Sequence, residues 1–117
     1  MKKVGLLGTK FTMEEDFFKN ELLKFEVNPI VPNKQEQEYI HNKIMDELEL
    51  GIVKDSTKRE LLKIIRRMGE EDLIDGVILG CTELPLILKQ EDEVDLKFLN
   101  TTKIHVEAII RELVRRG

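Results

Sequence analysis

The chain has 117 residues, of which 41% are hydrophobic and 36% are charged. This length fits one domain, and the apolar share excludes a disordered tail. Nineteen basic residues stand against twenty-three acidic ones, for a net charge of -4, and both signs are mixed along the chain. A nucleic-acid-binding domain would carry a basic surplus on one face, so we expect no nucleic-acid partner.

Cys81 is the one cysteine, which excludes an intrachain disulfide and any site built from several thiolates. The two histidines, His41 and His105, fall on different predicted helices, so we expect no metal site. The apolar run at residues 4–7 is too short for a signal peptide or a membrane span. The segment 5–9 matches neither a dinucleotide fingerprint nor a Walker loop. These features predict a cytoplasmic protein with a reduced thiol and no membrane partner.

The first part of the chain predicts a strand, a helix and a second strand. Residues 4–8 form a short apolar run bounded by glycine, which is typical of a buried strand, and the next four residues are expected to form a turn. From Met13 apolar residues recur at helical spacing, with Thr12 as the N-cap. A second strand at 27–31 contains Pro29, which has no N–H to donate and therefore predicts an edge position.

The middle of the chain predicts two helices and a central strand. A long helix is expected after Asn33, because apolar residues fall four apart and Gly51 stands where a C-cap would. Ser56 or Thr57 is expected to cap another helix with a regular apolar face. Residues 75–80 are apolar on both faces, as a central parallel strand must be.

The last part predicts shorter elements. A short helix is expected at 84–88 with Pro85 in its first turn, followed by an acidic loop at 91–95 and a weak strand at 97–100. Residues from 101 on predict a last helix that buries Ile104 and the apolar positions in register with it.

This alternation of strands and helices is typical of a parallel α/β sheet. We predict a single flavodoxin-like α/β domain over residues 1–117, with a four-stranded parallel sheet in the order 2-1-3-4 and helices on both faces. In such sheets ligands bind at the carboxyl ends of the strands. Residues that follow the first and third strands should therefore meet at one edge.

Cys81 is the first candidate for chemistry because it directly follows the predicted third strand. A free cysteine is more often a small buried hydrophobe than a reactive group. Gly80 allows close backbone approach, however, and the amides of the following turn can lower a thiol pKa. A thiolate at this position could act as a base or as a nucleophile.

Hydroxyl and basic side chains fall near the same predicted edge. Thr9 and Thr12 follow the first strand and Thr82 follows the third, an arrangement suited to a small carboxylate. Thr12 and Thr82 also fit simple helix caps. Lys58 and Arg59 begin a helix and could reach an anionic substrate, although basic residues in so charged a chain are usually just solvated.

Four ordered segments are recognisable together: residues 77–87, with the run GCTELP at 80–85, and shorter matches within 4–13, 40–51 and 101–105. They resemble the aspartate/glutamate racemase family over nearly the whole chain. Glutamate racemases usually carry histidine after the Cys-Thr pair of this motif, whereas Glu83 here indicates the aspartate or broad-specificity branch.

The resemblance implies a cofactor-independent enzyme of two similar α/β lobes, each supplying one cysteine to the cleft between them. This chain resembles the second lobe only. The resemblance implies that Cys81 is an acid/base thiol and that Lys58, or its neighbour Arg59, is the basic contact to substrate. The substrate-binding set that we predict is Thr9, Thr12, Lys58, Arg59, Gly80, Thr82 and Glu83. Asn100 stands where the family commonly has aspartate.

Racemisation needs a proton removed from one face of the α-carbon and another delivered to the opposite face, so two acid/base groups must flank the substrate. One Cys81 cannot fill both positions. Either a second copy of the chain contributes its own Cys81, or a missing N-terminal lobe supplies the second group, or the chain does not racemise.

The leading hypothesis is an amino-acid racemase lobe that is weak or inactive alone. The alternatives are a non-catalytic fragment or self-associating interaction domain, and a related enzyme acting on hydantoins, maleate or arylmalonates. We expect a homo-oligomer with contacts near Phe17, Phe18 or the helix of Ile104. A substrate-site Cys81 should react unusually fast with iodoacetamide, and aspartate should protect it.

Overall fold

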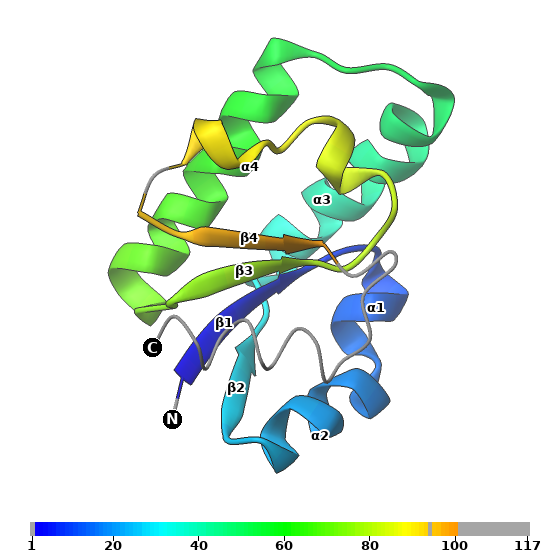
Figure 1. Ribbon diagram of the computed structural model, residues 1–117. Coiled ribbons are helices and arrows are strands. Elements are labelled where there is room, and N and C mark those ends of the chain that lie inside the picture. Colours follow the sequence, from blue (N-terminus) through cyan, green and yellow to red (C-terminus); the bar gives the residue numbers. More distant parts are fainter. Residues whose placement is uncertain (1, 94, 101–117) are drawn as a thin grey trace.

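The computed structural model describes residues 2–93 and 95–100 (Figure 1). The described strands are β1 (Lys2–Leu7), β2 (Val27–Ile30), β3 (Gly76–Leu79) and β4 (Lys97–Asn100). They form one sheet in the order β2-β1-β3-β4, and every neighbouring pair is parallel. The predicted order is confirmed, and so is the edge position of the strand that contains Pro29. The helix predicted from residue 101 on lies outside the described residues.

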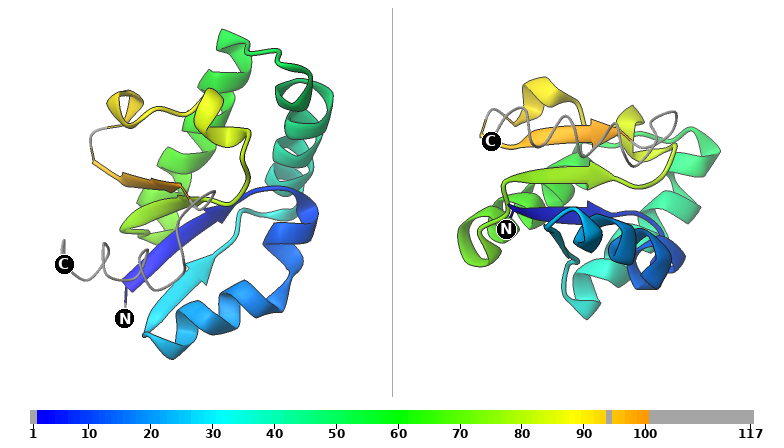
Figure 2. Two further views of the ribbon diagram at one scale, coloured as in Figure 1. Left: turned by 45° about the vertical axis from the view of Figure 1, so that its right-hand side comes forward. Right: turned by 60° about the horizontal axis from the view of Figure 1, so that its bottom comes forward.

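Helices cover both faces of the sheet, as predicted (Figure 2). Successive side chains of a strand point to opposite faces. Val77 therefore packs into the cluster formed with α3 (Lys34–Asp46) and α4 (Asp55–Arg67), while Ile78 packs with Leu22 of α2 (Asp16–Lys24) on the other face. The central strand β3 is buried along its whole length. Within the described part of the chain, no helix has the length and apolar character to cross a membrane.

The segment after β1 differs from the prediction. Of the four residues expected to form a turn, the last three begin α1 (Lys10–Glu14), and the first, Thr9, is the N-cap of this helix in place of Thr12. The Thr9 hydroxyl accepts from the Thr12 amide at 3.5 Å, and the Thr9 carbonyl accepts from the Met13 amide at 3.0 Å. Both bonds close one helical turn, which ends at Glu15 before α2 begins.

The boundary between α3 and α4 also differs from the prediction. A capping box at Asn33 starts α3 as expected, but Gly51, at φ 77°, ends the 3-10 turn η1 (Leu48–Leu50) and not the long helix. Thr57 does not cap α4, which begins after Lys54 without a side-chain cap. The reason is that the buried Thr57 hydroxyl donates to the Glu47 carboxylate at 2.6 Å.

The remaining short elements are tighter than predicted. The helix expected at 84–88 is the 3-10 turn η3 (Leu84–Leu86), and part of the expected acidic loop forms the 3-10 turn η4 (Gln90–Asp92). A π-helical turn, η2 (Met68–Asp72), joins α4 to the loop before β3.

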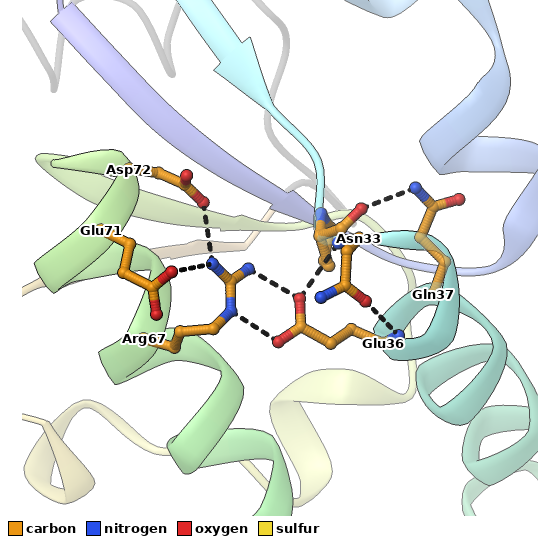
Figure 3. A network of polar contacts seen from close by, with 7 residues as sticks. Asn33, Glu36, Gln37, Arg67, Glu71 and Asp72 are labelled. Atoms are coloured by element: carbon orange, nitrogen blue, oxygen red, sulfur yellow. Dashed lines mark hydrogen bonds and ion pairs between the residues drawn. The ribbon is translucent and has the colours of Figure 1, made fainter.

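Arg67, at the end of α4, ties α4 to the start of α3 (Figure 3). Its Nε and Nη2 atoms each donate to one oxygen of Glu36 at 2.6 Å, which makes a bidentate pair. The same Glu36 carboxylate accepts from the Asn33 amide within the capping box. Asp72 lies 3.4 Å from Nη1 of Arg67. The two helices between β2 and β3 are therefore joined at this end, so η1 lies at the other end of the pair.

Candidate active site

The ends of β1 and β3 bring two predicted site segments together. Leu7 and Leu79 are paired in the parallel register, and the Gly80 amide donates to the Leu7 carbonyl at 2.7 Å. The chain after β1 and the chain after β3 therefore leave the sheet side by side, at the right-hand end of the strands in Figure 1. Thr9 follows the first strand and Cys81 follows the third, so this edge carries both.

Thr12 fills the space between two glycines at this edge. A Cβ atom at Gly80 would lie 2.8 Å from Cγ2 of Thr12 and 2.9 Å from the Leu7 carbonyl oxygen, and one at Gly8 would lie 3.0 Å from Cβ of Thr12. Real Cβ atoms essentially never approach as closely as the two contacts at Gly80, and the contact at Gly8 is tight. The structure thus explains Gly80 as the residue that lets α1 sit directly against the backbone that leads to Cys81.

The hydroxyl groups of Thr9 and Thr12 lie 3.4 Å apart. Both residues are half-buried at the start of α1. Their spacing allows one small polar group to contact both oxygens. Thr82 is exposed and donates its hydroxyl hydrogen to the carboxylate of its neighbour Glu83, which is the N-cap residue of η3.

Cys81 is partly buried against the core cluster under α3 and α4. Burial is the largest influence on its thiol and raises its pKa. The backbone amides of Leu84 and Glu83 hydrogen-bond the sulfur and lower the pKa, as predicted, but the carboxylates of Glu83 and Glu49 raise it further. The net shift of the Cys81 pKa is upward, because the effect of burial outweighs that of the turn amides, and this direction favours the protonated thiol at neutral pH.

The two basic candidates are held elsewhere. Nζ of Lys58 pairs with Oδ1 of Asp92 at 2.8 Å, and this bond lowers the pKa of the Asp92 carboxyl. Arg59 is exposed and lines a hollow along α4. The other residues that line this hollow are Leu62, Lys63, Arg66, Arg67 and Glu70. Neither cation is brought to the Thr9 and Thr12 hydroxyls by a described contact.

Comparison with known proteins decides the family of the chain. Residues 1–109 match the model of a family described as Asp/Glu/hydantoin racemase. The chain belongs to this racemase family. The resemblance identified in the sequence motifs is confirmed at the level of the family.

Two solved structures are similar to this racemase-family chain. A candidate Asp/Glu racemase from Yersinia pestis superposes with a TM-score of 0.81 and 31% identity, over 97% of this chain and 49% of that one. An aspartate racemase homologue from Pyrococcus horikoshii superposes with a TM-score of 0.80 and 38% identity, over 98% of this chain and 48% of that one. The chain thus spans about half the length of each of these proteins.

Two curated relatives add to the comparison. Glutamate racemase 3 of Caldanaerobacter subterraneus is 29% identical over 93 residues, which cover 79% of this chain and 32% of that protein. An uncharacterised protein from Pectobacterium carotovorum is 26% identical over 114 residues, which cover 97% of this chain and 69% of that protein. Much of the glutamate racemase therefore has no counterpart in this racemase-family chain.

Sequence reasoning missed two polar groups of this racemase-family chain that lie near the site. Nδ1 of His41 on α3 accepts from the Lys10 amide at the start of α1, at 3.0 Å. Glu49, in η1, acts electrostatically on Cys81 although 32 positions separate them. Neither contact has a local sequence signal, because each joins segments far apart in the chain. Within residues 2–93 and 95–100, no cluster of three or more His, Cys, Asp or Glu side chains could hold a metal ion.

Proposed function

We propose that the chain is one lobe of a cofactor-independent amino-acid racemase of the aspartate/glutamate type, in which Cys81 is one of two acid/base thiols. The observation that carries the proposal is the position of Cys81 at the carboxyl end of β3, beside the α1 turn that bears Thr9 and Thr12, in a chain of a racemase family. Ligands of parallel α/β sheets bind at this edge.

The proposed reaction moves two protons through two sulfurs. A thiolate removes the α-proton from one face of the substrate, and the electron pair of the broken C–H bond stays on the α-carbon as a carboxylate-stabilised carbanion. A thiol on the opposite face then donates its proton to that carbon. The first sulfur ends as a thiol and the second as a thiolate. Because burial raises the pKa of Cys81, we assign it the role of proton donor in the first turnover.

The polar residues of the edge would hold the substrate. We propose that Thr9, Thr12 and Thr82 bind the α-carboxylate and amine, with Glu83 beside Thr82 as an acceptor for the amine. Gly80 keeps the backbone close to them. A side-chain carboxylate on the substrate suits a basic contact. Supplying it from Lys58 requires that the substrate replace Asp92 at the ammonium group, whereas Arg59 is exposed and makes no ion pair with another of the described residues. The basic contact at Lys58 or Arg59 completes the predicted set.

The second acid/base group has to come from outside this chain's single Cys81. We propose a second copy of the chain, or an N-terminal lobe, seated on the edge that carries Cys81. Three exposed apolar side chains belong to the segments that lead to or follow that edge: Phe11 precedes Thr12, Leu50 follows Glu49 in η1, and Leu86 is the last residue of η3. Apolar side chains gathered around a site support a covered surface there.

The same exposed side chains favour a second candidate function, a self-associating interaction domain without catalysis. Phe11 is 77% exposed and Leu50 is 70% exposed, so they are available for contact between copies whether or not the thiol turns over. Activity on hydantoins, maleate or arylmalonates is a further alternative within the same architecture.

Protection of Cys81 by substrate tests the racemase proposal. Since burial raises the pKa of the Cys81 thiol, iodoacetamide labelling of the free chain should be slow near pH 7 and should accelerate into the alkaline range. Labelling speed is therefore a poor criterion, and the decisive comparison is with and without aspartate. We expect L- or D-aspartate to slow the labelling, and an equal rate with and without aspartate would favour the interaction domain.

Proton exchange gives an independent measurement. We expect racemisation of aspartate by the chain to be weak or undetectable, because the second group must lie within about 1 Å of its productive position to avoid losses on the order of 10²-fold. In its thiolate form a single Cys81 can still remove the α-proton, exchange the proton it has gained with D₂O, and return a deuteron to the same face of the carbon. Deuterium incorporation without loss of chirality is thus expected, and it should vanish in Cys81→Ala. Exchange that survives this substitution would remove Cys81 from the mechanism.

A further inference from the structure

His41 joins α3 to the first residue of α1. The imidazole is half-buried, and its Nδ1 atom accepts a hydrogen bond from the backbone N–H of Lys10 at 3.0 Å. A nitrogen that accepts cannot carry a proton, so the neutral ring has its hydrogen on Nε2. The contact spans 31 positions of sequence and lies one residue from Thr9.

The α1 turn depends on such tertiary bonds. It has five residues, and a helix this short is not stable by its own hydrogen bonds. Its first amides need partners outside the helix. The Thr9 hydroxyl accepts a hydrogen bond from the Thr12 backbone amide at 3.5 Å, and Nδ1 of His41 accepts one from the Lys10 backbone amide at the shorter distance of 3.0 Å. Met13 anchors the other end by full burial in the core.

A second contact links the same two elements but is exposed to solvent. Nζ of Lys10 pairs with the Glu38 carboxylate at 2.5 Å, with side chains 41% and 55% exposed. Exposed ion pairs contribute little to stability. The His41 bond is therefore the better candidate for holding the orientation of α1 against α3.

Orientation of α1 matters at the candidate site. Thr12 sits against the Gly80 backbone with too little space for a Cβ between them, and its hydroxyl lies 3.4 Å from that of Thr9. A rotation of the α1 turn would move both hydroxyls together and would change the packing next to Cys81. The amide that His41 binds is at the start of this same turn.

We propose that His41 is a positioning residue for the Thr9 and Thr12 hydroxyls, which it orients through the Lys10 amide. The proposal rests on the proposed function, in which those hydroxyls hold the substrate carboxylate and amine. His41 itself does not touch the substrate. Its contribution is an acceptor at the Nδ1 position, so any side chain with an acceptor there should replace it.

Two substitutions separate the acceptor from the bulk of the ring. His41→Asn places its amide oxygen near the position of Nδ1 and keeps an acceptor, whereas His41→Leu keeps apolar bulk and removes it. We expect His41→Leu to weaken the aspartate protection of Cys81 by about 3- to 10-fold, the range of one hydrogen bond. His41→Asn should stay close to the wild type. Glu38→Gln is the matched control, since it removes the exposed pair between the same elements and should leave protection unchanged.

Hydrogen exchange of the Lys10 amide gives a readout that does not depend on substrate. In the wild type and in His41→Asn this amide should exchange slowly, and in His41→Leu it should exchange faster while thermal unfolding shows that the fold is retained. Equal protection by aspartate in all three proteins, with Lys10 released in His41→Leu, would overturn the positioning role. If the wild type shows no aspartate protection at all, the proposed function fails and the positioning role fails with it. A Lys10 amide that exchanges equally in all three proteins would contradict the tether itself.

Discussion

Gly80 has no room for a side chain, and this constraint comes from two neighbours at once. One is the Cγ2 atom of Thr12, which can shift, and the other is the Leu7 carbonyl oxygen, which belongs to the central sheet and cannot shift without moving β1. The glycine is therefore a packing requirement of the site, whatever its part in substrate binding.

Gly80→Ala should lower the free energy of unfolding by about 1–3 kcal/mol, the usual cost of an overpacked interior. Urea unfolding measures this loss, and aspartate protection of Cys81 should fall with it. Gly69→Ala is the matched control, because its Cβ would meet Leu96 at 3.5 Å, an ordinary contact. Adding Thr12→Ser, which removes the Cγ2 atom, should recover part of the loss. Equal stability of the two alanine variants would show that the α1 turn shifts to accommodate the added Cβ atom at little cost in free energy.

Glu47 shows how a residue's titration reports its surroundings. The Glu47 side chain is buried. It accepts hydrogen bonds from Nζ of Lys43 at 2.8 Å and from the Thr57 hydroxyl at 2.6 Å. Two hydrogen bonds lower the pKa of the Glu47 carboxyl. The bond from Lys43 has the larger effect, and the bond from Thr57 has the smaller one. The folded chain therefore binds this proton less tightly than the unfolded chain, and the associated stability is present above the ordinary glutamate pKa of 4.5.

This stability should be lost as the pH falls through the folded-state pKa of Glu47, below pH 4.5. Glu47→Gln cannot titrate there, so it should be less stable than the wild type at pH 7 and should lose less stability between pH 5 and pH 3. Urea unfolding at several pH values gives both slopes. Glu21→Gln, which alters an exposed i,i+3 pair on α2, should follow the wild-type slope. A Glu47→Gln slope as steep as the wild type would assign the acid loss to other carboxyls, among them Asp92.

At the scale of elements, the α3–α4 pair is held at both ends by different chemistry. Near η1 the buried Glu47 links the two helices through Thr57. At the opposite end Arg67 binds Glu36 through two parallel bonds, with side chains only 26% and 14% exposed. Bidentate pairs shielded from water are stronger than single exposed ones. The helix pair is thus tied at both ends, and η1, which carries Glu49, lies at the end with the Glu47–Thr57 bond.

Arg67→Lys should lower the free energy of unfolding by about 1–2 kcal/mol, because an ammonium group cannot reproduce the two-pronged geometry of guanidinium. Chemical denaturation measures the change, and a double-mutant cycle with Glu36→Gln isolates the pair. Lys24→Ala, which removes an exposed pair with Glu21 on α2, should cost almost nothing. A coupling energy near zero between Arg67 and Glu36 would mean that the helices are held by their apolar contacts alone.

At the scale of the whole molecule, the proposed racemisation requires a second acid/base group at the sheet edge that carries Cys81. The reaction class needs a group on each face of the α-carbon, and the chain spans about half the length of the solved proteins it matches. An isologous dimer would set two Cys81 thiols across a twofold axis. Contacts near Phe17, Phe18 and the helix of Ile104, which the sequence predicts, fall outside the described side chains. The proposed interface therefore consists of the exposed side chains of Phe11, Leu50 and Leu86.

We expect light scattering to show a homodimer or a larger oligomer. Phe11→Ser together with Leu50→Ser should shift the chain toward the monomer, because these side chains are 77% and 70% exposed beside the candidate site. The matched control is Leu23→Ser with Phe25→Ser, which changes exposed apolar residues at the end of α2 and should leave the association unchanged. A monomer at high concentration would argue against a dimeric site and would leave the second acid/base group to a separate lobe.

The sequence by itself determined the order and direction of the four strands. The glycine-bounded apolar runs and the helical spacing between them depend on local composition, and parallel α/β connectivity restricts the strand order to few choices. Pro29 marked the edge strand because a missing N–H is a property of the residue alone. The position of Cys81 after β3 followed from the same pattern. These features require no knowledge of which distant residues meet.

Only the tertiary structure decided the partners of the polar groups. Thr57 fits a helix cap by its position, yet its hydroxyl bonds Glu47 across the helix pair. Lys58 is engaged by Asp92, 34 positions away. The pKa of Cys81 shows the reason most clearly, since the local amides lower it as predicted while burial raises it more. The burial of the sulfur depends on every element that packs around it, and the sequence near Cys81 does not specify which distant elements those are.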